Sequence, residues 1–260
     1  MRILCIGDVC APCGTEALLK ALPTLKKTLK ADAVIVNGEN SAEGNGISLW
    51  SSSVIFSAGA DVITGGNHTL RHREIHEKLD ENPFLLRPHN IDTPYGSGYC
   101  ILDLGRVQIA VINLSGQIYL EKEKATNPFL AADELIEKAK SDGAKLIFVD
   151  FHAEATSEKR ALGFYLDGKV TAVFGTHTHV QTNDAQVLPN GTGYITDLGM
   201  TGVEQSVLGV KKEIIINRLK SNDMSKFEFA EGECILNGCL FDVDINTGLC
   251  LSAEPIFKKV

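Results

Sequence analysis

Two histidines stand two residues apart in the segment GTHTHV (residues 175–180), directly after the apolar run TAVF (171–174). The run is rich in residues that favour β-strands, so His177 and His179 fall where a strand should end. Residues two apart in an extended chain point to the same side. The spacing therefore predicts that both imidazoles face one point in space, and imidazole is a common metal ligand.

Polar side chains also follow other apolar runs. The expected strands are 2–6, 33–37, 61–64, 107–113, 145–150 and 171–175. Because ligands of layered α/β folds bind outside the carboxyl ends of the strands, groups at five of these ends should converge. The candidate metal ligands at these ends are Asp8, Glu39, Asn40, Asn67, His152, His177 and His179.

This set of side chains mixes oxygen and nitrogen donors, which suit Mn, Fe, Zn and similar ions better than a thiolate site does. Any one of them alone is readily explained as a turn or capping residue. Their shared placement at strand ends instead favours a metal site. The set is too large for one tetrahedral zinc, and it fits two metal ions about 3.5–4 Å apart that share a carboxylate. A hydroxide held between two such ions could attack the phosphorus of a phosphate diester.

Helical patterns separate several of the expected strands. Residues 15–30 and 130–143 carry apolar side chains at helical spacing, with Pro23 as a kink or break in the first and Gly143 as the end of the second. Strand–helix alternation of this kind predicts an α/β layered fold.

The last part of the chain has a different pattern. Residues 226–232, 234–248 and 249–257 are predicted to be strands of an antiparallel sheet, separated by Gly and Asn turns. No internal repeat or Pro/Ser-rich linker interrupts the chain, so we expect a single domain over residues 1–260.

Composition limits the classes of partner. The formal charge of −8 disfavours a non-specific binder of duplex nucleic acid, which needs a cationic surface. A small anionic substrate remains compatible with that charge if a bound metal supplies positive charge locally. No apolar run is long enough to span a bilayer or to form a signal peptide, so the sequence predicts no membrane partner and a cytoplasmic location.

Five motifs together resemble those of a known family. They are GDV (7–9), NGEN (37–40), GGNHT (65–69), DFHAEATSEK (150–159) and GTHTHVQT (175–182). They resemble the calcineurin-like metallophosphoesterases and, more closely, the bacterial YmdB-type subgroup, which hydrolyses phosphodiesters including cyclic nucleotides. GNH alone is a weak match, whereas the whole series in the family's order is specific and covers nearly the whole chain. The resemblance implies a layered α/β/β/α sandwich of mixed sheets flanked by helices.

The resemblance also implies a role for each candidate. Asp8 and His179 would bind one metal ion, assisted by Asn40. The other ion would be bound by Asn67, His152 and His177. Glu39 would bridge both ions, and His68 would donate a proton to the leaving oxygen. The implied ions are two Fe or Mn, with Zn and Mg as alternatives. The broader family has His where this chain has Cys10 and bridges with Asp where it has Glu39, and both departures leave the metal identity open.

The implied substrate is a small phosphodiester such as a 2′,3′- or 3′,5′-cyclic nucleotide, and homo-oligomerisation is left open. A metal-dependent phosphomonoesterase and a weakly catalytic metal-binding regulatory protein are the alternatives. A thiol redox protein is a third, because Cys10-Ala-Pro-Cys13 has the spacing of a redox pair.

Other histidines have more ordinary explanations. His72 and His76 repeat at four-residue spacing from His68, but they lie in RHREIHEKLDE (71–81), which is so charged that we expect a solvated helix face. His89, next to Pro88, is a candidate for lining a substrate cleft.

Overall fold

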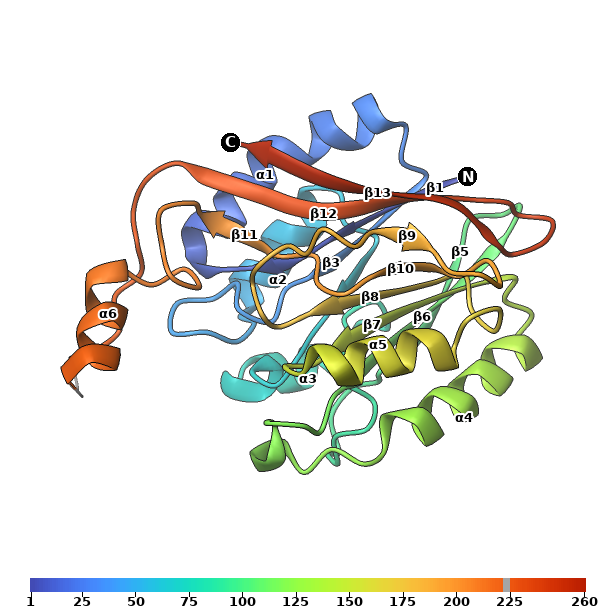
Figure 1. The fold of residues 1–260 in the computed structure, drawn as a ribbon, viewed down its shortest axis with the longest axis horizontal. Helices are drawn as coiled ribbons and strands as arrows, with labels where there is room; N and C mark the ends of the chain where they lie inside the picture. Colours follow the sequence, from blue (N-terminus) through green and yellow to red (C-terminus); the bar gives the residue numbers. More distant parts are fainter. Residues whose placement is uncertain (222–224) are drawn as a thin grey trace.

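The computed structural model describes residues 1–221 and 225–260, and Figure 1 shows two sheets stacked between helices. The strands of the first sheet are β1 (Arg2–Ile6), β2 (Asp8–Val9), β3 (Ala33–Asn37), β4 (Val62–Thr64), β11 (Met200–Val203), β12 (Cys234–Val243) and β13 (Cys250–Lys259). Those of the second are β5 (Tyr99–Asp103), β6 (Gln108–Ser115), β7 (Leu146–His152), β8 (Ala172–Thr176), β9 (Gln186–Val187) and β10 (Gly193–Ile195). The helices are α1 (Ala11–Leu29), α2 (Leu49–Ser57), α3 (Ile75–Glu81), α4 (Pro128–Ser141), α5 (Thr156–Tyr165) and α6 (Lys212–Ser221), with short 3-10 turns at Thr69–Arg71 and Glu121–Glu123.

Both sheets are mixed. Across the described residues the first runs β2-β11-β12-β1-β3-β4 with β13 on the other side of β12, and the second runs β5-β6-β7-β8-β10-β9. In the first sheet β1 is parallel to β3 and antiparallel to β12. The second combines parallel pairs such as β7–β8 with antiparallel pairs such as β5–β6. This arrangement confirms the expected layered α/β fold with mixed sheets.

Strand β1 shows how the layers are held together. Ile3 and Cys5 join the core between the two sheets, whereas Leu4 and Ile6 join the core under the α1 and α2 layer. Successive strand residues point to opposite faces, and both faces are covered, so the strand reads as one continuous apolar run. A third core lies between the second sheet and helices α4 and α5.

The predicted helices form, with one correction. Helix α1 begins at Ala11 and continues through Pro23, so of the predicted kink or break the break is wrong. Pro23 lies on the exposed side of the helix, where water can bond the carbonyl group that loses its intrahelical partner. Helix α4 lies within two residues of its predicted bounds and ends just before Gly143, whose φ is +87°. Among the helices described, none combines the length and apolar composition needed to cross a membrane.

The tail of the chain extends the first sheet. The strands predicted at 234–248 and 249–257 are confirmed as the antiparallel pair β12 and β13, and β12 also pairs along the whole of β1. The strand predicted at 226–232 is wrong, since within this segment Phe229 makes only an isolated bridge to Val210. Within the segment Ala230 is buried but Phe227 and Glu228 are exposed, so it lacks the alternation of buried and exposed residues that stabilises a strand.

Candidate metal centre

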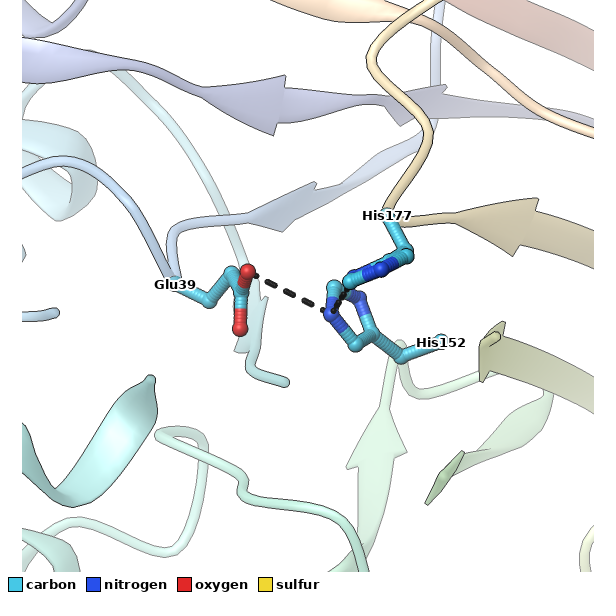
Figure 2. Close-up of side chains that lie close together, drawn as sticks. All are labelled: Glu39, His152 and His177. Atoms are coloured by element: carbon cyan, nitrogen blue, oxygen red, sulfur yellow. Dashed lines mark hydrogen bonds and ion pairs between the residues drawn. The ribbon is translucent and has the colours of Figure 1, made fainter. Parts of the chain in front are cut away.

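The metal-ligand candidates converge where strands of the two sheets end. Ligand atoms of Glu39, His152 and His177 lie within 4.8 Å of one another, and so do those of Asp8, Glu39 and His179. Figure 2 shows the Glu39 carboxylate facing His152, with His177 beside it. His152 Nε2 is 3.3 Å from Glu39 Oε1 and 3.0 Å from His177 Nδ1. Glu39 therefore belongs to both groups, which is the geometry of a shared ligand.

The two predicted asparagines complete the set. Asn67 Oδ1 is 3.0 Å from His152 Nε2. Asn40 Nδ2 is 2.7 Å from Glu39 Oε1 and 3.1 Å from His179 Nε2. All seven side chains predicted to converge are thus brought together, and their roles as ligands stay predictions.

His177 and His179 reach the centre by a route that the sequence did not predict. Strand β8 ends at Thr176, and the φ angles of His177 and His179 are +101° and +63°, so the chain between them is not extended. Positive φ is uncommon for a residue with a side chain and is kept only where the surroundings fix it. Here the His177 N–H donates to Asp8 Oδ2 at 3.1 Å, and the Met200 N–H donates to the His179 carbonyl at 3.2 Å.

A buried ion pair between Lys159 and Asp197 supports the turn that carries His177 and His179. Lys159 is 1% exposed, and its Nζ lies 2.6 Å from Asp197 Oδ2 and 2.7 Å from the Thr176 carbonyl. Asp197 Oδ2 also accepts from the Thr178 N–H at 3.0 Å. The sequence analysis did not single out Lys159 as a residue that supports the site. A detectable signal existed, because Lys159 shares an apolar helical stripe with Leu162 and Leu166.

Hydrogen bonds fix which nitrogen of His152 faces the centre. Thr176 Oγ1 donates to Asp150 Oδ1 at 2.7 Å, so the same oxygen accepts from His152 Nδ1 at 2.9 Å. Nε2 of His152 is left pointing at Glu39. Metal-ligating histidines commonly have such a partner on the other ring nitrogen.

His177 turns its other ring nitrogen, Nδ1, toward the centre. Its Nε2 lies 3.0 Å from Glu154 Oε2, a half-exposed carboxylate at the rim of the site, and its Nδ1 faces His152. Four residues contact ligand candidates or the turn that carries them: Asp150, Glu154, Thr176 and Asp197.

Burial and the interactions between charged groups together set the pKa values at the site. It raises the pKa of Asp8 to about 8, with nearby carboxylates adding to the effect. It also lowers the pKa of His177 to about 3 and that of His179 to about 4. Burial alone would lower the pKa of His152, but the Glu39 and Asp8 carboxylates outweigh it and raise the pKa to about 9. Burial likewise opposes ionisation of Glu39, yet His152 and His68 hold its pKa well below the usual range.

Three observations show that the site fits metal ions. Asp8 Oδ1 and Asn40 Oδ1 are buried, and neither has a hydrogen-bond partner among the described residues. An unpaired buried acceptor costs about 1–3 kcal/mol, which a coordinated cation would offset. A Cβ on Gly66 would overlap both Glu39 Oε2 and His152 Nε2, so this position has room only for glycine. The donors are oxygens and imidazole nitrogens, as divalent ions of the Mn, Fe and Zn type prefer.

The centre forms the floor of a cleft of about 980 Å³. His68 lines this cleft with its side chain 30% exposed, and its Nδ1 lies 3.3 Å from Glu39 Oε1. The His68 N–H also donates to Glu39 Oε2 at 3.0 Å. His68 is thus next to the shared carboxylate and open to the cleft, a position suited to proton transfer with a bound molecule.

The remaining histidines lie apart from the centre. His72 Nε2 bonds the Asn45 carbonyl at 2.8 Å, and His76 Nε2 bonds the Leu70 carbonyl at 3.0 Å. Both are half-buried, so the expectation of a fully solvated helix face is wrong for them, although no metal site forms there among the described residues. His89 lines a separate pocket of about 510 Å³ and not the cleft above the centre.

The cysteines of the CxxC segment face different neighbours. Cys10 is buried, and its Sγ lies 3.4 Å from His179 Nδ1, against the candidate ligands. Burial raises the pKa of the Cys10 thiol, which makes it a weak nucleophile. Contact with Cys234 lowers the pKa of Cys13 to about 7, and the Cys13 thiol lies 3.9 Å from the Cys10 carbonyl oxygen. Cys10 is thus buried and little ionised, which makes it a poor partner for redox chemistry with Cys13.

Known proteins are similar to this chain in fold and sequence over nearly its whole length. The model of the family described as YmdB-like protein matches residues 4–256. A Bacillus subtilis (strain 168) protein named 2′,3′-cyclic-nucleotide 2′-phosphodiesterase is 46% identical over 258 residues, covering 98% of this chain and 96% of its own. The crystal structure of a novel phosphatase from Mycoplasma pneumoniae is 37% identical with a TM-score of 0.94, covering 100% of this chain and 93% of that one. A crystal structure of a hypothetical protein from Thermus thermophilus is 36% identical with a TM-score of 0.92, covering 100% and 99%.

Proposed function

Because the chain belongs to the YmdB-like protein family, we propose that it is a metal-dependent phosphodiesterase whose substrates are 2′,3′-cyclic nucleotides. One observation carries the proposal: two groups of ligand atoms share the buried carboxylate of Glu39. The name of the Bacillus subtilis relative supports the choice of substrate. 3′,5′-Cyclic nucleotides are the alternative substrate within the same reaction class. We also propose that residues 1–260 form one domain.

For the ligands we propose the assignment that the resemblance implies, and the proximity of these side chains supports it. One site would use Asp8, His179 and Asn40, the other would use Asn67, His152 and His177, and Glu39 would serve both. Two divalent cations held there, Fe or Mn with Zn and Mg as alternatives, would neutralise the phosphate and make water a nucleophile by lowering its pKa to roughly 7. The hydrogen bond of His152 to Thr176 and the contact of His177 with Glu154 would keep the proposed ligand nitrogens turned inward.

His68 is proposed as the general acid. It stands next to Asn67 in the chain, is held by Glu39 through its backbone N–H, and exposes its imidazole to the cleft. A protonated imidazole in that position can donate to the leaving alkoxide. General acid catalysis of this kind contributes typically about 10²–10⁴-fold.

Hydrolysis of bis(p-nitrophenyl) phosphate tests the reaction class, and hydrolysis of 2′,3′-cyclic AMP tests the role of His68, because its leaving alkoxide needs a proton and p-nitrophenolate does not. Wild type, His68→Ala and His76→Ala would each be loaded with Mn²⁺ or, without oxygen, with Fe²⁺. His76 is the matched control because it bonds the Leu70 carbonyl outside the cleft. We expect metal-dependent turnover in wild type and His76→Ala, and a loss of about 10²–10⁴-fold in His68→Ala on the cyclic nucleotide with the metal content retained. Full activity of His68→Ala would remove it from the mechanism, and folded, metal-loaded wild type without turnover would favour a regulatory metal-binding protein.

A phosphomonoesterase is the second candidate, since the Mycoplasma pneumoniae structure that the chain resembles is described as a phosphatase. Product analysis separates the two. The proposed reaction converts a 2′,3′-cyclic nucleotide into a 3′-nucleotide and stops there. Release of inorganic phosphate from the 3′-nucleotide at a comparable rate would instead establish the monoesterase.

A further inference from the structure

One wall of the cleft comes from an arm that stands apart from the sheets. We define the arm as residues 204–221 and 225–233, between β11 and β12. Its two described stretches run side by side, because the Ala230 N–H donates to the Gly209 carbonyl and the Lys211 N–H donates to the Glu228 carbonyl, both at 2.9 Å. Helix α6 belongs to the arm, projects away from the sheets in Figure 1 and has no buried residue. The arm is therefore not positioned by a core behind α6.

The base of the arm lies against Cys10, which is itself next to a candidate metal ligand. A Cβ on Gly209 would lie 3.3 Å from the Cβ of Cys10, and the Cys10 thiol is itself 3.4 Å from His179 Nδ1. The arm thus begins its course along the cleft next to the ligand candidates. What it presents to the cleft lies within reach of a substrate bound at the centre.

The side chains that the arm turns toward the cleft are mostly apolar. They are Val207, Leu208, Val210, Ile215, Phe227 and Phe229, which we call the apolar wall. Leu208 is 49% exposed and Phe227 is 60% exposed. Contiguous apolar surface of this kind on the side of a cleft is typical of a ligand-binding surface.

The position of the wall limits what can occupy it. A phosphodiester that reacts at the centre must place its phosphate on the floor of the cleft, so the rest of the molecule extends along the walls. The volume of about 980 Å³ leaves room for much more than the phosphate.

Charge in the cleft narrows the choice further. Above the floor the cleft is lined by the acidic residues Glu43, Glu154, Glu228 and Glu231 and by the basic residues Arg71 and Lys211. Lys211 Nζ is already paired with Glu228 at 2.6 Å. The excess of carboxylates disfavours a second phosphate in this part of the cleft. A flat, uncharged group that stacks on aromatic rings satisfies both the apolar wall and the acidic rim.

We propose that the apolar wall binds the nucleobase of a single nucleotide, with Phe227 and Phe229 as the residues on which the base stacks. This inference rests on the proposed function, because it assigns the far end of the substrate whose phosphate reacts at the metal centre. The wall then determines specificity without taking part in bond breaking. Its removal should weaken binding of nucleotides and leave phosphate chemistry intact.

The test compares substrates that differ only in the base. We would measure KM and kcat for 2′,3′-cyclic AMP, 2′,3′-cyclic CMP and glycerol 1,2-cyclic phosphate, which has the cyclic diester and no base. The variants are Phe227→Ala and Phe229→Leu, the second retaining an apolar side chain in case loss of the first ring unfolds the arm. Leu219→Ala is the control, since Leu219 is 84% exposed on α6 and lies outside the cleft.

In Phe227→Ala we expect KM for the cyclic nucleotides to rise roughly 5- to 150-fold, with kcat nearly unchanged. The rise should be larger for the purine, and glycerol cyclic phosphate should show none. Leu219→Ala should behave as wild type. An equal loss on all three substrates, or no loss in either Phe variant, would overturn the proposal. So would a change in sedimentation mass without a base-dependent change in KM, because the wall would then be an interface between copies of the chain.

Failure of the proposed reaction can be told apart from failure of the wall. If wild type hydrolyses no cyclic nucleotide, equilibrium dialysis with adenosine still measures whether the wall binds a base. Binding that is lost in Phe227→Ala and kept in Leu219→Ala would support the wall even though the reaction is wrong. Absence of adenosine binding to such an inactive wild type would overturn the wall as well.

Discussion

Replacing Lys159 with methionine tests how the turn that carries His177 and His179 is held. Lys159 Nζ donates to Asp197 Oδ2 at 2.6 Å and to the Thr176 carbonyl at 2.7 Å, with the side chain 1% exposed. Methionine fills most of the same volume without the charge, so the loss is mainly electrostatic. Removing one partner of a buried pair typically costs about 3–5 kcal/mol, because the other charge stays buried and unpaired.

Two details place this variant at the lower end of that range. Asp197 keeps hydrogen bonds from the Thr178 N–H at 3.0 Å and the Gly199 N–H at 2.8 Å, so its carboxylate is not left without donors. We therefore expect the free energy of unfolding to fall by about 3 kcal/mol in Lys159→Met. Metal affinity should fall by about 10- to 100-fold, since the turn that orients His177 loses its support.

Urea unfolding of the metal-free protein measures the first effect, and competition with a metal-binding dye measures the second. Lys140→Met is a matched control, because Lys140 Nζ lies 2.7 Å from Glu137 Oε1 but the pair is exposed. An exposed pair contributes about 0–1 kcal/mol. The double variant Lys159→Met/Asp197→Asn should recover part of the lost stability, since no charge is then left unpaired. If Lys159→Met lost no more stability than Lys140→Met, the argument from burial would be refuted.

Two further predictions concern the centre itself. Gly66→Ala should prevent metal binding while the protein stays folded, because the added methyl group would overlap Glu39 Oε2. Elemental analysis of the purified variant measures this, and a full metal complement would contradict it. Thr176→Val should lower metal affinity by about 10- to 100-fold, because it breaks the hydrogen-bonded link between Asp150 and His152. Thr176→Ser keeps the hydroxyl and should retain the affinity. Equal affinities of the two variants in dye competition would show that the hydroxyl does not orient His152.

The sequence predicted the strands that carry the site because their pattern is local. Strands such as β1 and β7 are buried on both faces, so they appear as continuous apolar runs with a polar residue at the end. Because ligands bind at the carboxyl ends of such strands, the convergence of Asp8, Glu39 and His152 could be expected from the sequence alone.

Other features depend on contacts that no short segment encodes. Arg2 pairs with Asp242, so β12 lies next to β1 although nearly the whole chain separates them. The turn at His177 and His179 was expected to be extended, and it is instead held at positive φ by hydrogen bonds with distant residues. The two imidazoles do converge as predicted, although the chain between them is not extended. Tertiary contacts outweigh the local backbone preference at this position.

The placement of residues separates chemistry from specificity. The ligand candidates stand at the ends of buried strands, where packing on both sides fixes them, and rigid elements are what precise metal geometry requires. The apolar wall stands on an arm whose helix buries nothing, so its side chains can change without disturbing either sheet. Substitutions at the strand ends should therefore act on metal content and kcat, and substitutions in the arm should act on KM. A variant of the arm that lost its metals would contradict this division, because it would show that the arm helps to build the centre and does more than select what reaches it.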